Sequence, residues 1–206
     1  MLVTFEGIEA AGKSTLIAAL AADLRNGGDL VLVTREPGGT PLGDSLRAVF
    51  LDPALRIDPL AEVLLLNAAR AQLVADVIAP ALKDRTVVLC DRFFDATVAY
   101  QAYGRGLDLE AVLDLCLTAT HRIAPDLTFL IDVPVELSRE RLRVRGGADR
   151  LEREDAEFHA RVREGYLRLA ERFSNRYVIL DGRLPPERLA ALASEELARR
   201  RSAALP

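Results

Sequence analysis

Residues 7–14 read Gly-Ile-Glu-Ala-Ala-Gly-Lys-Ser, a spacing of glycine, lysine and hydroxyl that suits phosphate binding. Gly7 and Gly12 let the backbone turn and approach an anion without a Cβ clash. Successive N–H groups at the start of a helix then surround the phosphates, with Lys13 on the β- and γ-phosphates and the Ser14 hydroxyl on Mg²⁺. The pattern therefore predicts an ATP-binding loop made of Gly7, Ile8, Glu9, Ala10, Ala11, Gly12, Lys13, Ser14 and Thr15.

Lys13 is also unusual within the composition. Of 27 basic residues only Lys13 and Lys83 are lysine, so arginine is the default cation of this chain. A lysine at position 13 is then expected to do chemistry that arginine cannot, at an exposed junction of loop and helix. This makes it a predicted catalytic residue.

Asp91 follows an apolar run, residues 86–90, and precedes Arg92. An acidic residue at the carboxyl end of a strand beside the first strand suits a carboxylate that faces a metal and phosphates. An aspartate after a strand is also a common turn former, but the phosphate-binding loop upstream and the adjacent arginine favour function. Ser14 and Asp91 are the predicted ligands of a Mg²⁺ cofactor.

These residues need a frame, and the apolar pattern predicts one. Five short apolar runs, at 2–6, 30–34, 86–90, 127–132 and 177–180, alternate with segments of helical period, such as 14–25, 60–82 and 109–122. Strands covered on both faces read as continuous apolar runs. The pattern predicts an α/β fold: a doubly wound parallel sheet of about five strands, of the P-loop NTPase type, with right-handed crossovers. We expect one domain over residues 1–206.

Two insertions interrupt the alternation. Residues 36–84 are long enough for two helices and are expected to build a wall of a binding site. Residues 139–153 hold six arginines around Gly146 and Gly147 and are expected to form a lid. A solvated helix face, with Glu136, Glu140 and Glu152 as partners, is the alternative for that stretch.

Composition excludes several classes. Half of the residues are hydrophobic and the net charge is −4, which argues against disorder and against a general nucleic-acid binder. No apolar run reaches the length of a membrane span, no signal peptide is recognisable, and Cys90 and Cys116 form no metal or disulfide pattern. We therefore expect a cytoplasmic protein with no membrane partner.

Five further motifs resemble the signatures of bacterial thymidylate kinases. They are residues 34–40 (Thr-Arg-Glu-Pro-Gly-Gly-Thr), 67–70 (Asn-Ala-Ala-Arg), 91–97 (Asp-Arg-Phe-Phe-Asp-Ala-Thr), 99–105 (Ala-Tyr-Gln-Ala-Tyr-Gly-Arg) and 149–152 (Asp-Arg-Leu-Glu). The resemblance runs in order from residue 3 to about residue 188. It implies transfer of the ATP γ-phosphate to dTMP, giving dTDP for dTTP synthesis, in a homodimer whose face the apolar stretch 60–77 could supply.

The resemblance also implies roles on the acceptor side. Glu9 would hold the deoxyribose 3′-hydroxyl, and Arg92, a second predicted catalytic residue, would bind the dTMP phosphate. The other implied acceptor-side residues are Arg35 and Arg47 at that phosphate, Arg70, Gln101 and Thr97 at the thymine edge, Tyr100 at the sugar, and Leu66 where the family stacks a phenylalanine on the base.

Members of the family without an arginine in the phosphate-binding loop take the catalytic arginine from the lid. Here Ala10 stands in the loop, where bacterial relatives commonly have glycine, and Ala96 replaces a usual serine. Because Arg150 lies in the matching lid motif, it is the predicted catalytic arginine, with Arg143, a predicted ATP contact, and Arg145 as second choices.

Two other interpretations stay open. The chain could phosphorylate a different monophosphate, such as dUMP or dGMP. It could instead be a P-loop ATPase that switches a partner and has no acceptor, although the acceptor-side arginines and Gln101 disfavour this. His121 and His159 are isolated on expected helices, and the sequence assigns them no role.

Overall fold

A computed structural model describes residues 1–146 and 149–203 and shows a parallel sheet of five strands in the order β2-β3-β1-β4-β5. The strands are β1 (Leu2–Glu6), β2 (Val31–Arg35), β3 (Val87–Asp91), β4 (Leu127–Asp132) and β5 (Tyr177–Asp181). The predicted parallel sheet is confirmed. β1, β3 and β4 are buried along almost their whole length, which explains their continuous apolar sequences.

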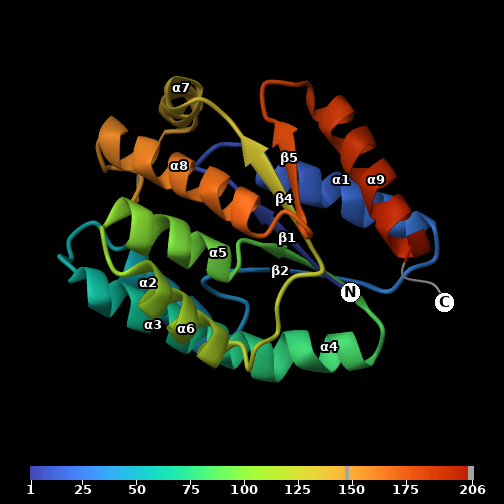
Figure 1. Cartoon of the computed structure of the whole chain (residues 1–206), viewed down its shortest axis with the longest axis horizontal. Coiled ribbons are helices and arrows are strands. Elements are labelled where there is room, and N and C mark those ends of the chain that lie inside the picture. The colour runs from blue at the N-terminus through green and yellow to red at the C-terminus, as the bar shows by residue number, and fades with distance from the viewer. Residues whose placement is uncertain (147–148, 204–206) are drawn as a thin grey trace.

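Helices cover both faces of the sheet (Figure 1). α1 (Lys13–Asn26) and α9 (Pro186–Ala203) pack together on one face. The other face carries α5 (Phe94–Thr97), the π-helical turn η2 (Val98–Gly104), α6 (Leu109–Ala119) and α8 (Ala156–Arg172). Such two-sided coverage is the doubly wound arrangement that the alternating pattern predicts.

All five strands end at a charged residue, and because they are parallel these ends share one edge of the sheet. The terminal residues are Glu6, Arg35, Asp91, Asp132 and Asp181. β1 is the central strand and pairs with β3 and β4, for example Phe5 with Asp91 and Phe5 with Phe129. The edge next to β1 and β3 is therefore where the loop 7–14 and Asp91 meet, at the usual ligand position of an open α/β sheet.

The first insertion forms α2 (Pro41–Leu51) and a long helix that runs through α3 (Pro59–Leu73), the π-helical turn η1 (Val74–Ile78) and α4 (Ala79–Lys83). Thr40 and Asp58 cap the two starts by accepting from Gly43 N and Leu60 N. By length and composition alone the long helix could cross a membrane, which the apolar run lengths did not predict. Core helices of soluble proteins also meet this criterion of length and composition. The buried face of the long helix carries Glu62 and Arg70, and both form ion pairs.

The predicted lid begins in α7 (Val135–Arg145) and continues after Gly146, whose φ of 70° ends the helix. Gly147 of the predicted lid and the last three residues of the chain lie outside the described residues. Asp155 caps the next helix, α8, by accepting from Phe158 N at 2.7 Å. The lid segment thus connects β4 to α8 along the edge that carries the strand ends.

Candidate active site

The phosphate-binding loop follows β1 and leads directly into α1. A side chain at Gly7 would place its Cβ 2.5 Å from Ile131 O, and the φ of 134° is one that glycine tolerates, so this position requires glycine. Ala10 is left-handed, with φ 52°, a conformation that glycine adopts more readily than alanine. Lys13 Nζ donates to Gly7 O and Ile8 O at 3.1 Å each, so the loop curves around the ammonium.

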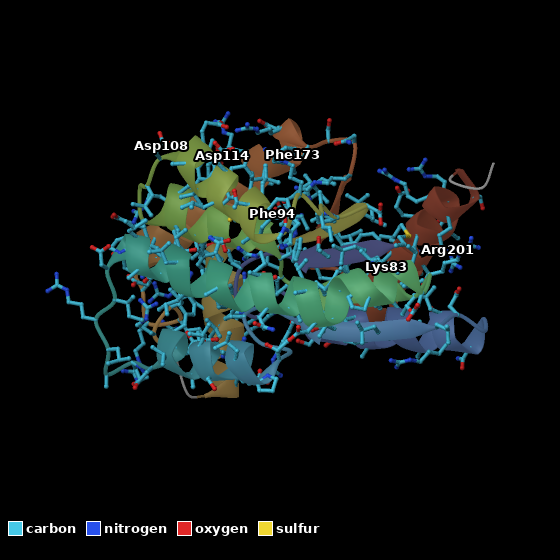
Figure 2. The ribbon with its side chains drawn as sticks, turned by 90° about the horizontal axis from the view of Figure 1, so that it is seen from below. Lys83, Phe94, Asp108, Asp114, Phe173 and Arg201 are labelled. Carbon is cyan, nitrogen blue, oxygen red and sulfur yellow. The ribbon has the colours of Figure 1, made fainter. Side chains whose placement is uncertain are left out.

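Lys13 is buried, contrary to the expectation of an exposed junction. Burial first, and then the nearby Arg92 guanidinium, lower its pKa to about 8, against the opposing charges of Asp91 and Glu9. Without bound phosphate the ammonium is therefore held in an unfavourable environment, and an anion beside it would relieve that cost. The chain's other lysine, Lys83, is exposed at the end of α4 (Figure 2) and precedes β3, whereas the site lies where β3 ends.

Ser14 and Asp91, the predicted metal ligands, lie side by side: Ser14 Oγ is 3.4 Å from Asp91 Oδ2. Hydroxyl and carboxylate oxygens are the donors that Mg²⁺ prefers, and it completes its octahedron with water and phosphate oxygens. No group of three His, Cys, Asp or Glu side chains able to hold a metal occurs in the described part of the chain. The donor set thus fits Mg²⁺ held jointly with a nucleotide.

A cleft of about 390 Å³ opens beside the loop, between the first insertion and the lid. It brings together most of the residues that the sequence predicts for the site. Those bordering it are Glu9, Ala10, Ala11, Gly12, Lys13, Ser14, Thr15, Arg35, Arg47, Leu66, Arg70, Asp91, Arg92, Thr97, Tyr100 and Gln101. Gly7, Ile8, Arg143 and Arg150 are not among its lining residues.

Arg92 is the centre of a polar cluster at the floor of the cleft. Its guanidinium donates to Glu9 Oε1 at 3.1 Å, Tyr100 OH at 3.1 Å and Tyr166 OH at 2.9 Å. It also lies 4.9 Å from the centroid of the Tyr100 ring, within cation–π range. These contacts fix the orientation of a planar group that suits bidentate phosphate binding.

Glu9 is held ionised by its neighbours. Burial acts to raise the pKa of its carboxyl, but contacts with His159, then Arg92, Tyr100 and Lys13, outweigh burial and lower the pKa to about 2. His159 Nδ1 lies 3.3 Å from Glu9 Oε2 without the alignment of a hydrogen bond. Sequence reasoning assigned His159 no role because its partner lies 150 positions away along the chain.

Arg70 is a buried charge at the far end of the cleft, with 2% of its surface exposed. It donates to Glu36 Oε2 at 2.9 Å, Asn67 Oδ1 at 2.7 Å and Thr97 Oγ1 at 2.7 Å. Glu36 borders the cleft as well, and its Oε1 is buried with no hydrogen-bond partner in the part of the chain that the structure describes. Glu36 belongs to the 34–40 motif, but it was not among the residues predicted for the site.

Arg35 and Arg47 flank the loop on the side of the first insertion. Arg35 Nη2 lies 3.3 Å from Asp44 Oδ1 and is largely exposed, whereas Arg47 Nη1 donates to Pro37 O at 3.0 Å. Burial and the neighbouring Arg35 lower the pKa of Arg47. Two cations this close to each other and to Arg92 make this side of the cleft attractive to an anion.

The lid arginines are distributed differently from the prediction based on the 149–152 motif. Arg145 borders the cleft and pairs with Glu152, while Arg143 is exposed. Arg150 is turned away: it donates to Glu62 and, at 2.9 Å, to Phe50 O, and lies over the Phe50 ring. Of Arg143, Arg145 and Arg150, only Arg145 therefore borders the cleft in this arrangement.

A second, mainly apolar cavity of about 300 Å³ lies on the other side of the loop. Leu16, Leu184 and Leu189 line it together with Arg141, whose guanidinium donates to Ala10 O at 3.2 Å and Gly182 O at 3.0 Å. The sequence prediction did not include this cavity. Arg141 was visible only as one of six lid arginines, and nothing in its spacing distinguished it.

Comparison with known proteins identifies relatives over nearly the whole chain. A family model described as thymidylate kinase matches residues 5–192. The chain is 48% identical over 202 residues to the thymidylate kinase of Trichlorobacter lovleyi, covering 95% of each chain. It is 48% identical over 191 residues to that of Deinococcus radiodurans, covering 93% of each.

A solved structure agrees. The crystal structure of thymidylate kinase from Ehrlichia chaffeensis matches with a TM-score of 0.78 at 34% identity, covering 96% of this chain and 98% of that one. These matches confirm the resemblance that the motifs indicated and the P-loop NTPase type of the sheet.

Proposed function

This chain belongs to the thymidylate kinase family, and we propose that it converts dTMP to dTDP with ATP in the cleft described above. It is thus an ATP-dependent nucleoside-monophosphate kinase that acts in dTTP synthesis. The observation that carries the proposal is the cluster of Arg92, Glu9 and Tyr100 next to the buried Lys13. It offers one place for an acceptor phosphate beside the place for the ATP phosphates.

The reaction needs positioning more than covalent help. An oxygen of the dTMP phosphate attacks the γ-phosphorus, and the bond from that phosphorus to the β-bridging oxygen breaks, so ADP leaves with the electron pair. The attacking oxygen is already anionic, so no general base is required. Lys13 and Arg92 would lower the repulsion between the two phosphates, and Mg²⁺ at Ser14 and Asp91 would neutralise charge on the β- and γ-phosphates.

The acceptor would lie along the cleft floor. Glu9 would accept from the 3′-hydroxyl, since its low pKa keeps it an acceptor at every physiological pH. Tyr100, buried against Arg92, would leave no room for a 2′-hydroxyl. The base would lie at the far end, between Leu66 and the polar groups of Arg70, Thr97 and Gln101.

The second cavity is the site that we propose for the adenine of ATP. Apolar side chains supply flat contact area, and Arg141 bridges the loop to the segment after β5. A nucleotide with its phosphates on the loop 7–14 and its base in this cavity would leave the main cleft free for dTMP.

For the lid, geometry and motif point to different arginines. Arg145 borders the cleft, so we propose that it meets the transferred phosphoryl group. Arg150, the choice from the motif, would first have to leave Glu62. Arg143 is exposed and could contact ATP only after the lid closes.

Two further proposals follow from the family. Leu60 and Leu64 on α3 are about half exposed, at 52% and 53%, and would suit an apolar homodimer face. Measuring the mass of the particle in solution tests this. Cytoplasmic location is the second proposal.

The decisive experiment measures ADP release with ATP, Mg²⁺ and a panel of monophosphates. We expect dTMP to stimulate release far more than dUMP, dGMP or any other monophosphate. Preference for dUMP or dGMP would reassign the acceptor. Equal ATP turnover with and without dTMP would overturn the kinase reaction in favour of a P-loop ATPase.

A further inference from the structure

Glu62 is a fully buried carboxylate that binds three residues from two other segments of the chain. It lies in the first turn of α3, outside the cleft wall. Its Oε2 accepts from Gln101 Nε2 at 2.8 Å and from Arg105 Nε at 3.4 Å, and its Oε1 accepts from Arg105 Nη2 at 3.2 Å and from Arg150 of the lid. Two guanidinium groups thus fix the position of the carboxylate, and the shortest hydrogen bond to its Oε2 comes from Gln101.

The pairing determines which way the Gln101 amide points. A carboxylate can only accept hydrogen bonds, so Gln101 must turn its NH₂ group toward Glu62. Its carbonyl oxygen, Oε1, is then left on the other side, buried and without a hydrogen-bond partner among the described residues. Gln101 borders the cleft, and a buried acceptor of this kind is costly until a donor reaches it.

The fixed amide has a consequence for the base. Thymine and uracil carry an N–H at ring position 3, whereas cytosine carries a lone pair there. We propose that Glu62 is a positioning residue that holds Gln101 with its oxygen toward the base, and so selects a pyrimidine with an N–H at that position. This inference rests on the proposed function, in which the cleft takes a pyrimidine monophosphate.

The test compares dTMP with 5-methyl-dCMP, which has the same methyl group and differs only at positions 3 and 4 of the ring. The quantity measured is the substrate ratio, defined as kcat/KM for dTMP divided by kcat/KM for 5-methyl-dCMP. In Glu62→Gln the new amide can accept as well as donate, so Gln101 is free to turn over. We expect the ratio to fall at least about tenfold, because a site built for one hydrogen-bond pattern loses its discrimination when the pattern relaxes.

Glu154→Gln is the matched control. Glu154 pairs with the same Arg105, at 2.7 Å, but no hydrogen bond joins it to Gln101 in the described part of the chain. The substrate ratio should stay within about twofold of the parent, since the Glu154 side chain is partly exposed, at 28%, and partly solvated ion pairs contribute little. If Glu154→Gln lowers the ratio as much as Glu62→Gln, the effect comes from the arginine cluster and the inference is overturned.

Gln101→Leu keeps the test decisive even if Glu62→Gln does not fold. This apolar replacement should itself lower the ratio, and adding Glu62→Gln to it should change the ratio no further. A ratio unchanged in Gln101→Leu would overturn the inference, as would a folded Glu62→Gln with the parent's ratio. The same assay also tests the proposed function by itself. If the parent enzyme does not phosphorylate dTMP, the proposed function is overturned, whatever the variants do.

Discussion

Glu9 Oε1 and Arg92 Nη2 meet at 3.1 Å, although one residue lies in the phosphate-binding loop and the other follows β3. Both side chains are largely buried, so each is the main charge that the other faces. The positions proposed for the sugar hydroxyl and for the acceptor phosphate are therefore one connected unit. Removing either partner would leave the other buried with fewer compensating contacts: Glu9 would keep His159, Tyr100 and Lys13, and Arg92 would keep the two tyrosines.

Lys13→Ala should lower kcat by orders of magnitude at saturating ATP and dTMP. The variant loses the ammonium at the phosphates, while folding loses only two hydrogen bonds to the loop. Lys13→Arg should also be poor, because a broad planar guanidinium does not fit under the curved loop. Steady-state kinetics with a thermal unfolding control checks both, and near-normal turnover of Lys13→Arg would contradict the argument from composition.

ATP binding should weaken as the pH rises above about 8. In the free protein the pKa of Lys13 is lowered to about 8, and bound phosphate should raise it again. Above that pH the free lysine is neutral and must take up a proton on binding, so affinity should fall up to about tenfold per pH unit. Below pH 8 this group adds no pH dependence.

Isothermal titration calorimetry between pH 7 and 10 measures this, and proton uptake appears as a dependence on the ionisation heat of the buffer. Lys13→Ala is the control, because it should lack this proton uptake. An ATP affinity that is constant from pH 7.5 to 9.5 would show that phosphate does not meet this lysine.

Leu66→Phe should bind dTMP as tightly as the parent or more tightly. Leu66 is buried in the cleft wall, and an aromatic face against the base adds about 0.5–1.5 kcal/mol. Calorimetric titration with dTMP gives the affinity. Leu115→Phe, on the exposed side of α6, is the matched control and should leave the affinity unchanged. Weaker binding in Leu66→Phe would mean that the cleft is packed around leucine.

Arg145→Ala should reduce kcat by about 10³ while nucleotide binding changes little, because a lid cation acts mainly in the transition state. Arg150→Ala and Arg143→Ala, assayed beside it at saturating substrates, should lose less. A larger loss in Arg150→Ala would restore the assignment from the motif and imply that the lid rearranges. Near-normal kcat in all three variants would leave the lid as a charged surface.

The strands and the phosphate-binding loop could be predicted because their signals are local. Continuous apolar runs located all five strands to within one residue at each end; β2 and β3 each begin one residue later than predicted. The helix expected at 109–122 ends at Ala119, since His121 and Arg122 are left-handed. The π-helical turn η2 that presents Tyr100 and Gln101 has no such local signature, because tertiary packing decides it.

Side-chain partnerships were harder to predict. Glu62 looks like an ordinary acidic residue in the first turn of a helix, and its partners Gln101 and Arg150 lie 39 and 88 positions away. Arg150 was chosen because its motif matched, yet only the fold shows that Glu62 and Phe50 hold it. Sequence motifs identify which residues belong to such a site, whereas the order of the strands in the sheet determines which of them are in contact.

The position of β1 in the sheet also governs how the molecule can fold. β1 is the first strand made, but its two neighbours are the third and fourth, so one of its edges stays open until Asp132 has joined the chain. Such distant pairing closes long loops and slows folding. Until β4 has been synthesised, the loop 7–14 lacks the contact between Gly7 and Ile131 that supports it in the folded protein. A nascent or truncated chain that ends before β4 should therefore be unable to consume ATP, and phosphoryl transfer begins only once the sheet is nearly complete.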